Sequence, residues 1–324
     1  MLLCSALPYL FHRCIMVEDL KYCRRGAYRF PGGVIGSGAI LFLATGLSAQ
    51  NLFVSVSDYD VPFTPTSTIV TIAPGGAQST FASGLGEPFG PVFDSAGNLF
   101  ESDYYDGNIY KFTPGGVQST FASGLNLPIG LAFDTAGFLF EADCVSGNIY
   151  KFASDGSQST FASGLNAPMS LAFDSAGNLF VGDQGNGNIY KFTPGGARST
   201  FASGLGGLYG LAFDNAGNLF EADGSSGNIY KFTPGGARST FASGLNNPNA
   251  LTFNSAGNLF VADLSSNIYE FTPGGVQSTY ATIPGVPEGL AFDPAPAPEP
   301  SVLVLVAGAA VAVFGRYSFT RPRR

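Results

Sequence analysis

Hydrophobic and aromatic residues occur along most of the chain in short runs, and each run ends at a cluster of Gly, Pro, Asp or Asn. Residues 129–134 (IGLAFD), 138–143 (FLFEAD), 148–152 (NIYKF) and 158–162 (QSTFA) form one set of four such runs. Apolar runs of this length between turn signals are typical of β-strands. The pattern therefore predicts many short strands joined by tight turns.

Two recurring tetrapeptides account for half of these turns. Residues 94–97 (DSAG) offer Asp to begin a type I turn and Gly to end it. Residues 113–116 (TPGG) combine a Pro, which presets φ, with a Gly that tolerates positive φ, and this predicts a type II turn.

The set of four runs repeats along the chain with a period of 40 residues, marked by the segment FASGL. FASGL begins at Phe81, Phe121, Phe161, Phe201 and Phe241, and a degenerate copy begins at Tyr280. Four short strands with four tight turns fill about 40 residues, the size of a β-propeller blade.

The strand count predicts an all-β fold, a six-bladed β-propeller of four-stranded blades over residues 50–293. Sets of the second to fourth strands begin at Asn51, Asn98, Phe138, Asn178, Asn218 and Asn258, the first with an insertion near residues 60–67. First strands end at Asp94, Asp134, Asp174, Asp214, Asn254 and Asp293. The last strand, 288–293, is therefore expected to pair with the strand after Asn51 and close the ring, which leaves no open edge.

Units such as GLAFDNAGNLFEAD (210–223) followed by GNIYKFTPGG (227–236) resemble NHL repeats and the related gluconolactonase-like propellers. The resemblance covers essentially residues 51–293. It implies the propeller fold, which hosts binding, lactone hydrolysis and lyase chemistry on one scaffold.

The N-terminal 49 residues are predicted to be a signal peptide region. An apolar stretch at 34–47 follows a basic segment and precedes small residues, which indicates export with cleavage after Ala49. Because this stretch lies far from Met1, we expect translation to begin at Met16.

The C-terminal end has three parts: a Pro-rich linker (294–300), an apolar segment (301–315) and a tail with four arginines. Together with Pro298, Glu299 and Pro300, these parts resemble the PEP-CTERM sorting signal of exported bacterial proteins. The resemblance implies transient membrane insertion through 301–315 and removal of the helix by an exosortase-type enzyme. The protein is then expected at the surface of, or outside, a cell that we expect to be Gram-negative; a simple C-terminal membrane anchor is the alternative.

Charge and residue types exclude several classes of function. Both ends carry +3, so the formal charge of −8 leaves −14 for residues 50–298, and such a body repels nucleic acid. His12 and three of the four cysteines lie in the N-terminal segment. Without that segment Cys144 is the remaining thiol, which excludes intrachain disulfides, Cys/His zinc sites and a His base.

Functional residues are predicted on one face of the propeller. The turns between the second and third strands, and those between successive blades, differ in every copy, whereas the other turns barely change. The residue just before each innermost strand is predicted to line the channel mouth as a ligand site; the alternative is that these residues only plug the channel. These candidates are Phe89, Ile129, Met169, Tyr209, Asn249 and Glu288, with Tyr104, Tyr105 and Asp106 as a rim.

Two sets of carboxylates recur within the second strands. Asp residues at their ends are expected to bond to the Asn that opens the third strand, as Asp103 with Asn108. Glu101, Glu141 and Glu221 stand where residues 181 and 261 are Val. A buried carboxylate needs a partner, so these three are expected either to reach solvent or to pair locally.

The sequence therefore favours an exported binding or matrix propeller over an enzyme. Its predicted partner is an extracellular polysaccharide or another protein, and no cofactor is predicted. The alternative, implied by the resemblance, is a lactonase that holds a divalent cation, such as Ca²⁺, at the channel mouth through Asn249 and Glu288.

Overall fold

The computed structural model describes residues 14–17, 20–23, 50–58 and 66–294. The predicted cleavage at Ala49, the insertion and the sorting signal with Pro298, Glu299 and Pro300 lie outside or largely outside these residues. In the N-terminal unit, β1 (Cys14–Val17) and β2 (Leu20–Cys23) pair as an antiparallel hairpin. Within the described residues, no helix has the length and apolar character needed to cross a membrane.

Six four-stranded antiparallel sheets form the second unit, and we number them as blades 1 to 6 with strands a to d from the axis outward. The a strands are β26 (Val286–Phe292), β6 (Val92–Phe93), β10 (Pro128–Phe133), β14 (Pro168–Phe173), β18 (Leu208–Phe213) and β22 (Pro248–Phe253). The b strands are β3 (Leu52–Ser57), β7 (Leu99–Asp103), β11 (Leu139–Asp143), β15 (Leu179–Asp183), β19 (Leu219–Asp223) and β23 (Leu259–Asp263).

The outer strands follow in the same order. The c strands are β4 (Ser67–Ile72), β8 (Asn108–Phe112), β12 (Asn148–Phe152), β16 (Asn188–Phe192), β20 (Asn228–Phe232) and β24 (Asn267–Phe271). The d strands are β5 (Gln78–Leu85), β9 (Gln118–Ser123), β13 (Gln158–Ala162), β17 (Arg198–Ser203), β21 (Arg238–Ala242) and β25 (Gln277–Thr282). One short 3-10 helix, η1 (Gln184–Asn186), lies between β15 and β16.

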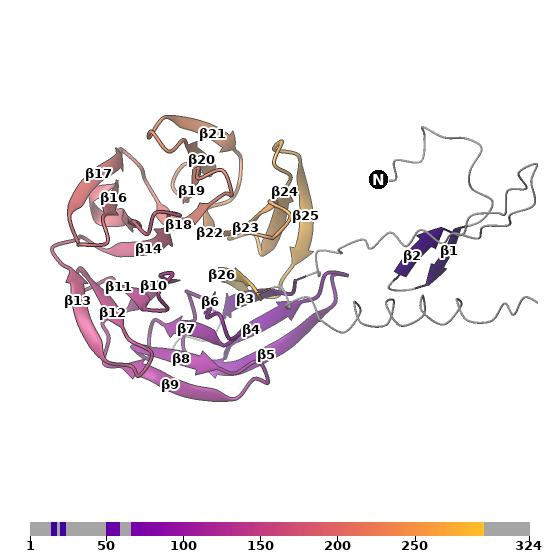
Figure 1. Cartoon of the computed structure of the whole chain (residues 1–324), viewed down its shortest axis with the longest axis horizontal. Helices are drawn as coiled ribbons and strands as arrows, with labels where there is room; N and C mark the ends of the chain where they lie inside the picture. Colours follow the sequence, from indigo (N-terminus) through magenta and orange to yellow (C-terminus); the bar gives the residue numbers. More distant parts are fainter. Residues whose placement is uncertain (1–13, 18–19, 24–49, 59–65, 295–324) are drawn as a thin grey trace, which may run out of the picture. The chain divides into compact units, whose positions relative to one another are not determined.

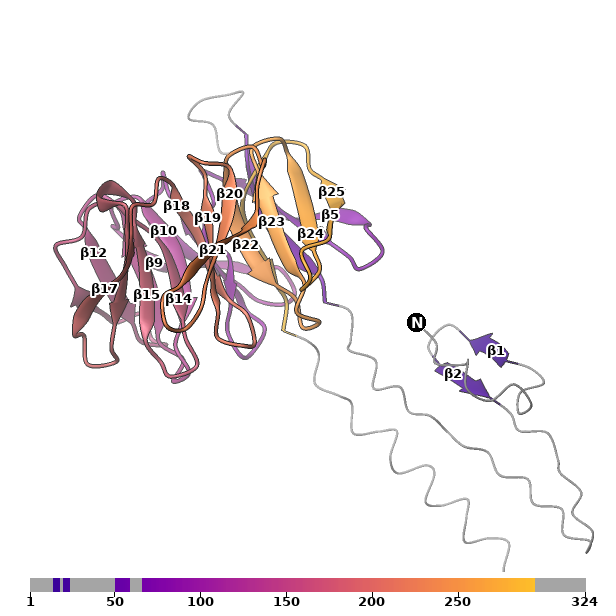
Figure 2. The same ribbon diagram turned by 90° about the horizontal axis from the view of Figure 1, so that it is seen from above.

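The predicted six-bladed propeller and its closure are confirmed. The blades stand around a central axis, as Figure 1 shows face-on and Figure 2 from the side. In blade 1 the C-terminal strand β26 pairs with the N-terminal strand β3, from Val286 opposite Ser57 to Phe292 opposite Leu52. No sheet edge is left open between the first and last strands of the ring.

The same hydrogen bonds hold the a–b junction whether or not the chain is continuous there. In blade 2 the Asp94 carboxylate accepts the backbone and side-chain N–H groups of Asn98, both at 2.8 Å. In blade 1, where no turn links the strands, Asp293 accepts the corresponding two groups of Asn51, also at 2.8 Å. The side chains of the turn therefore hold together the two ends of the propeller.

The two recurring turns have one conformation, which corrects the prediction of a type II turn. In TPGG the N–H of Gly116 donates to Thr113 O, and the positive φ (79°) belongs to Gly116 and not to Gly115. In DSAG, Gly97 likewise donates to Asp94 O and has a φ of 80°. Both are thus type I turns followed by a left-handed glycine, because a right-handed twist of the hairpin suits that combination.

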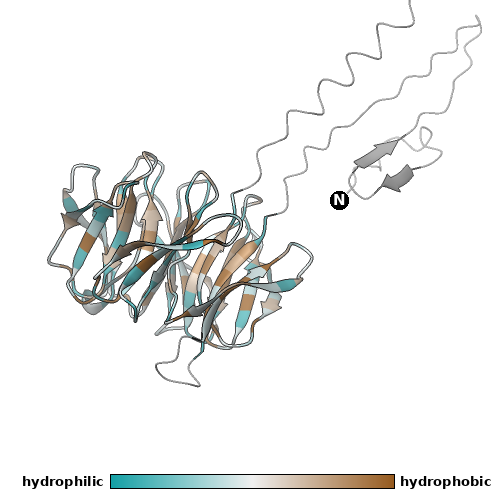
Figure 3. Cartoon of the chain, turned by 90° about the horizontal axis from the view of Figure 1, so that it is seen from below, coloured by the Kyte–Doolittle hydropathy of each residue, from teal (hydrophilic) through white to brown (hydrophobic). Residues whose placement is uncertain are grey.

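Phenylalanine fills the faces between neighbouring blades. Phe100 on β7 contacts Phe121 of its own blade and Phe133 of the next, with ring centroids 5.0 and 5.1 Å apart and edge-on planes. Equivalent triplets centre on Phe53, Phe140, Phe180, Phe220 and Phe260. Hydrophobic residues accordingly concentrate along the strands in Figure 3.

The a strand of blade 2 is shorter than the other five. β6 has two residues, and a separate bridge joins Pro88 to Asp103. Pro91 occupies the position that Leu131 has in β10, and a proline has no N–H to donate to the ladder. The strand is therefore interrupted at this residue.

Candidate functional site

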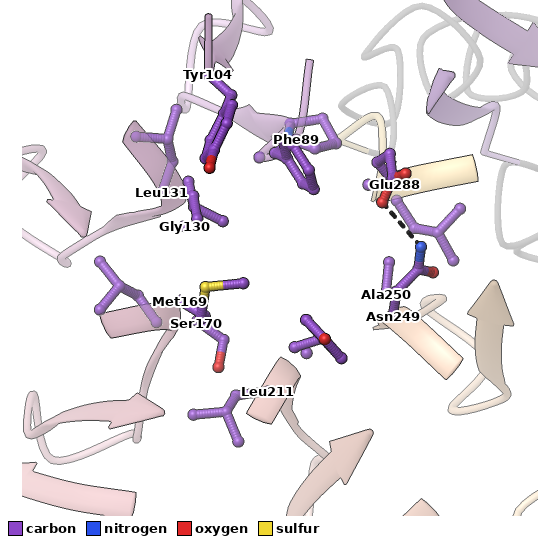
Figure 4. A pocket seen from close by; sticks show the side chains of 18 of the residues that line it. Phe89, Tyr104, Gly130, Leu131, Met169, Ser170, Leu211, Asn249, Ala250 and Glu288 are labelled. Carbon is purple, nitrogen blue, oxygen red and sulfur yellow. Dashed lines mark hydrogen bonds between the residues drawn. The ribbon is translucent and has the colours of Figure 1, made fainter. Parts of the chain in front are cut away.

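A pocket of about 530 Å³ opens at the mouth of the central channel, on the face formed by the b–c and d–a turns. All six candidate mouth residues line it, and so do Tyr104 and Tyr105. Figure 4 shows several of these side chains arranged around the open centre. The predicted face therefore carries a pocket that the predicted residues line.

The mouth side chains reach the pocket because of a backbone irregularity repeated in the a strands. The register of β14 against β15 shifts between Pro168 and Ser170, which makes Met169 an extra residue with no partner in the ladder. The same shift places Tyr209, Asn249 and Glu288 outside the ladder in their blades. A β-bulge of this kind re-aims the side chain, here into the channel mouth. These residues were expected at the start of the innermost strand or just before it, and they lie one or two residues inside it.

Below the mouth the channel narrows through one layer of small residues to an apolar floor. A Cβ on Gly130 would lie 2.5 Å from Met169 O of the next blade, and one on Gly289 would collide with Phe89 O, so small residues are required there. The floor consists of five leucines and a proline: Leu131, Leu171, Leu211, Leu251, Leu290 and Pro91.

One sector of the mouth is polar. Asn249 Nδ2 donates to Glu288 Oε2 at 2.9 Å, and both residues are more than nine-tenths buried. Figure 4 shows this pair on one side of the opening. Across the mouth, Gln184 Nε2 on η1 donates to Tyr209 OH at 3.3 Å.

The aromatic sector is formed by Phe89, Tyr104 and Tyr105, whose rings follow one another with centroids 5.5 and 5.3 Å apart. Burial, with smaller contributions from Cys144 and Glu87, raises the pKa of Tyr104, and the charge of Glu87 raises the pKa of Tyr105. Both phenols are therefore neutral at pH 7. Asp106 is not among the residues that line the pocket: it is exposed, and its carboxylate accepts the Tyr110 hydroxyl at 2.8 Å.

The turns around the pocket are held by the Asp at the end of the b strand in blades 2 to 6, but not in the predicted way. Asp103 accepts the backbone N–H groups of Gly86 and Glu87 in the d–a turn and of Asp106 in the b–c turn. The expected partner, Asn108, instead donates to the Tyr110 hydroxyl. Asp143, Asp183, Asp223 and Asp263 make corresponding bonds, so each of these Asp residues joins the two variable turns of its blade.

Sequence reasoning missed several lining residues, above all Glu87. It lies in the d–a turn before β6, is 6% exposed and lines the pocket beside Phe89 and Tyr104. The sequence did contain a signal for Glu87: among the first five d–a turns, GEPF is the only one with an acidic residue. Gln184, Asn247 and Cys144 also line the pocket. Burial, followed by the charge of Asp143, raises the pKa of Cys144, so its thiol is not activated as a nucleophile.

The residues at the mouth make a poor site for a divalent cation. Ca²⁺ takes about six to eight oxygen ligands, whereas Asn249 and Glu288 bond to each other and four of the six mouth positions are Phe, Ile, Met and Tyr. Over residues 50–58 and 66–294 there is no group of three His, Cys, Asp or Glu placed to hold a metal. Metal binding at Asn249 and Glu288 stays a prediction for experiment.

The three glutamates in the b strands do not reach solvent. Glu101, Glu141 and Glu221 are all 0% exposed. Glu101 pairs locally, since Ser55 Oγ of blade 1 donates to it at 2.8 Å. The carboxyl oxygens of Glu141 and Glu221 have no hydrogen-bond partner among the described residues. The expectation of solvent or a local partner is therefore wrong for these two.

No protein-family model matches this sequence, and no curated protein matches it. Among solved structures, a chain of a nidogen/laminin complex is 21% identical with a TM-score of 0.67, and the match covers 76% of this chain and 99% of that one. A gluconolactonase of Xanthomonas campestris is 17% identical with a TM-score of 0.61, covering 73% and 87%. A virginiamycin B lyase of Staphylococcus aureus is 16% identical with a TM-score of 0.56, covering 77% and 92%. At these identities the likeness shows the fold, which binding proteins and enzymes share.

Proposed function

We propose that this chain is an exported binding propeller of the cell surface or extracellular matrix, and that the pocket at the channel mouth holds its ligand. The observation that carries the proposal is the contrast between the two faces. Turns of nearly constant sequence lie on one face, whereas six different side chains enter one pocket on the other, four of them at equivalent bulges. A scaffold needs no such differences, and a binding site for one asymmetric ligand does.

The loop face also offers contact area around the pocket. Tyr105, Val145 and Leu264, from three different b–c turns, are 56%, 61% and 40% exposed. Exposed apolar side chains beside a pocket are typical of surfaces that meet a partner. A polysaccharide or protein would contact this rim while one of its groups enters the mouth.

The first experiment tests binding. The protein purified from cells that express the full chain is screened against arrays of extracellular glycans and surface proteins, and each hit is measured with Tyr209→Ala and Met169→Ala. Loss of the hit in both variants, with unchanged melting temperature, supports the proposal. The matched control is Val117→Ala, an exposed turn residue on the opposite face. Hits that only Val117→Ala abolishes would refute the assignment of the site.

The second experiment tests export and sorting. Intact-mass spectrometry of the exported protein should show a new N-terminus at Gln50 and a C-terminus near Glu299. Glu299→Ala should leave residues 301–324 attached and shift the protein to the membrane fraction. A Glu299→Ala protein with the same mass and location as the unaltered protein, apart from the substitution, would contradict the sorting proposal and favour a plain anchor.

The alternative of a divalent-cation-dependent lactonase rests on two oxygen-bearing side chains of the mouth, Asn249 and Glu288, which lie side by side. It predicts a Ca²⁺-dependent melting shift that EDTA reverses and that both Asn249→Ala and Glu288→Ala abolish. It also predicts hydrolysis of aldonolactones. A shift together with hydrolysis would replace the binding proposal by the lactonase.

A further inference from the structure

The pocket has the chemistry to select one class of ligand group. Resting on the proposed function of this pocket in binding, we propose that it takes an organic cation, namely an ammonium or guanidinium group carried on an apolar body. The charge of the lining, the aromatic sector and the floor of the channel each lead to this class.

The charges in the lining have one sign. Glu87 and Glu288 are 6% and 7% exposed and lie on the adjacent blades 2 and 1. No Lys, Arg or His occurs among the described residues that line the pocket. The pocket also lies in a propeller of formal charge −14. The negative propeller therefore attracts a cationic group as it approaches, and the two glutamates attract it inside the pocket. An anion would be repelled during approach and inside the pocket.

The aromatic sector adjoins the carboxylates. In Figure 4, Phe89 lies between Tyr104 and Glu288 at the edge of the opening. An ammonium group beside Glu288 therefore lies close to an aromatic ring, and the ring face attracts it through its quadrupole. Carboxylates and aromatic faces together favour a cation over a neutral hydroxyl group.

The remainder of the pocket suits an apolar body. Met169 lies across the opening from Glu288 (Figure 4), and Ile129 and the leucines of the floor also line the pocket. A polyol placed here would leave hydroxyl groups against apolar surface without hydrogen bonds, which costs free energy. An alkyl or aromatic body has no hydrogen bonds to lose on contact with this apolar surface.

Both acidic residues are held in place before a ligand arrives. Asn249 Nδ2 donates to the Glu288 carboxylate, and Glu288 is the bulge residue of β26. The backbone of Glu87 is held at both ends: its N–H donates to Asp103 Oδ1, and its carbonyl accepts the Tyr104 N–H at 2.9 Å. A fixed Glu288 carboxylate and a fixed Glu87 backbone lower the ordering cost of binding.

The test uses three probes of equal chain length: n-hexylammonium, 1-hexanol and hexanoate. Binding to the purified protein is measured by isothermal titration calorimetry and by ligand-observed NMR at low ionic strength. We expect hexylammonium to bind at least about tenfold more tightly than hexanol and hexanoate to bind most weakly. Equal affinities for the ammonium and the alcohol, or tighter binding of hexanoate, would overturn the cation proposal.

Variants separate this proposal from the proposed function. Glu288→Gln and Glu87→Gln should each weaken hexylammonium binding about tenfold and leave hexanol binding unchanged. The matched control is Asp155→Asn, an exposed carboxylate on the opposite face. If hexanol binds and Met169→Ala weakens it, but neither glutamine variant affects hexylammonium, the pocket binds ligands and the cation proposal fails. If no probe binding responds to Met169→Ala, the binding function itself fails.

Two sources could present the cation, a small amine or a basic side chain of a protein. A capped Ala-Lys-Ala peptide is therefore compared with hexylammonium, and capped Ala-Nle-Ala serves as the neutral control. Tighter binding of the lysine peptide than of both others assigns a protein side chain, and tighter binding of hexylammonium assigns a small amine. Equal affinities of the Ala-Lys-Ala and Ala-Nle-Ala peptides would count against the proposal.

Discussion

The six interfaces between blades differ in the third residue of the b strand. Three interfaces carry a valine, namely Val54, Val181 and Val261, and three carry a glutamate, namely Glu101, Glu141 and Glu221. All six side chains are 0% exposed. The same backbone position is therefore packed with hydrocarbon in half of the ring and with carboxyl groups in the other half.

The residue facing this position on the preceding blade changes together with it. Each valine packs in one cluster with an alanine: Val54 with Ala262, Val181 with Ala142, and Val261 with Ala222. The glutamates lie at positions that face Ser55, Ser102 and Gly182, and the bond between Ser55 and Glu101 shows the first of these contacts.

Blade 4 provides its serine from another strand. A Cβ on Gly182 would collide with Ser170 Oγ of the neighbouring a strand, so this hydroxyl occupies the space that Ser102 Oγ has in blade 2. Both hydroxyls donate to a backbone carbonyl of the next blade, Ser102 to Ile129 and Ser170 to Leu208. Every blade that faces a glutamate of the next blade thus places one serine hydroxyl near that glutamate. The blades that face a valine have an alanine at the facing position and no hydroxyl there.

The difference shows how a buried acid is tolerated. Burial raises the pKa of Glu101 and Glu141 well above its usual value, and raises that of Glu221 to about 9. At pH 7 Glu221 is a neutral acid, which costs far less to bury than a carboxylate. The serine oxygens keep lone pairs free to accept from a protonated carboxyl or from a bridging water.

The largest effect is expected when a glutamate enters a valine interface. Val181→Glu places a carboxyl group against Ala142, where no hydroxyl is available. We expect the free energy of unfolding at pH 7 to fall by about 4 kcal/mol, from protonation or burial of the charge and from overpacking. Urea denaturation measures the change.

Two further variants decide whether the serine matters in that experiment. Val181→Thr introduces a polar atom without a charge and should cost less than Val181→Glu. Ala142→Ser combined with Val181→Glu should recover part of the loss, with a coupling of about 1 kcal/mol. Strict additivity of the two substitutions would show that the pairing of Glu with Ser across the interfaces has no energetic basis.

Raising the pH should destabilise the protein through the glutamate interfaces. Glu221 titrates near 4.5 when unfolded and at about 9 when folded, so the folded state binds more protons between these values. Its contribution is fully present below about pH 4.5, is lost as the pH rises, and levels off above about pH 9. By pH 7 the loss is about 3 kcal/mol.

Glu221→Gln isolates this contribution, because glutamine does not ionise. The difference in unfolding free energy between Glu221→Gln and the unaltered protein should grow in favour of the variant from pH 5 to pH 9. Asp155→Asn, an exposed carboxylate, should show no such trend. A difference that stays constant with pH would mean that Glu221 is ionised in the folded protein.

A smaller effect is expected from the one serine that bonds directly to a glutamate. Ser55→Ala removes the donor to Glu101 and should cost about 1 to 2 kcal/mol at pH 7. The exposed Ser239→Ala, which loses a 3.3 Å bond to Lys231 O, is the matched control and should cost less. If the two changes cost the same, the hydroxyl at the interface would have no special role.

The smallest effect is expected for Glu141→Gln at pH 5. A protonated carboxyl and an amide have nearly the same shape and no charge, and the unfolded glutamate is only partly ionised in excess of the folded one, so unfolding free energies should agree within about 1 kcal/mol. At pH 9 the variant should be the more stable protein. Marked destabilisation at pH 5 would indicate that Glu141 holds a charge paired with a bound cation.

Much of the fold could be predicted from the sequence, because its causes are local. The strands at 148–152 and 158–162 have the predicted bounds, and the ring closes as predicted. The predicted type II conformation of the TPGG turn was wrong. Pro followed by two glycines allows both a type I and a type II turn, and the twist of the hairpin selects type I. The bond from Asp103 to Asn108 was also wrong, because the d–a turn brings the competing N–H groups of Gly86 and Glu87.

The sequence predicted where the candidate site lies but not all of the residues that line it. Symmetry breaking between the copies located the six mouth residues, yet Glu87 and Gln184 were missed because their turns come from different blades and meet only in space. Asp106 follows Tyr105 directly, but it bonds to Tyr110 and lies outside the lining. Neighbourhood in sequence does not tell which way a turn residue points.

The sequence by itself determined the blade, the number of blades and the face on which the copies differ. These follow from strand length, turn residues and a period of 40, all of which act within a single unit. Only the tertiary structure decided that six side chains meet in one pocket, four of them aimed by bulges, and that Glu141 and Glu221 are buried between blades. The reason is that these environments are formed by residues about 40 positions or more apart, whose contacts exist only once the blades have packed around the channel.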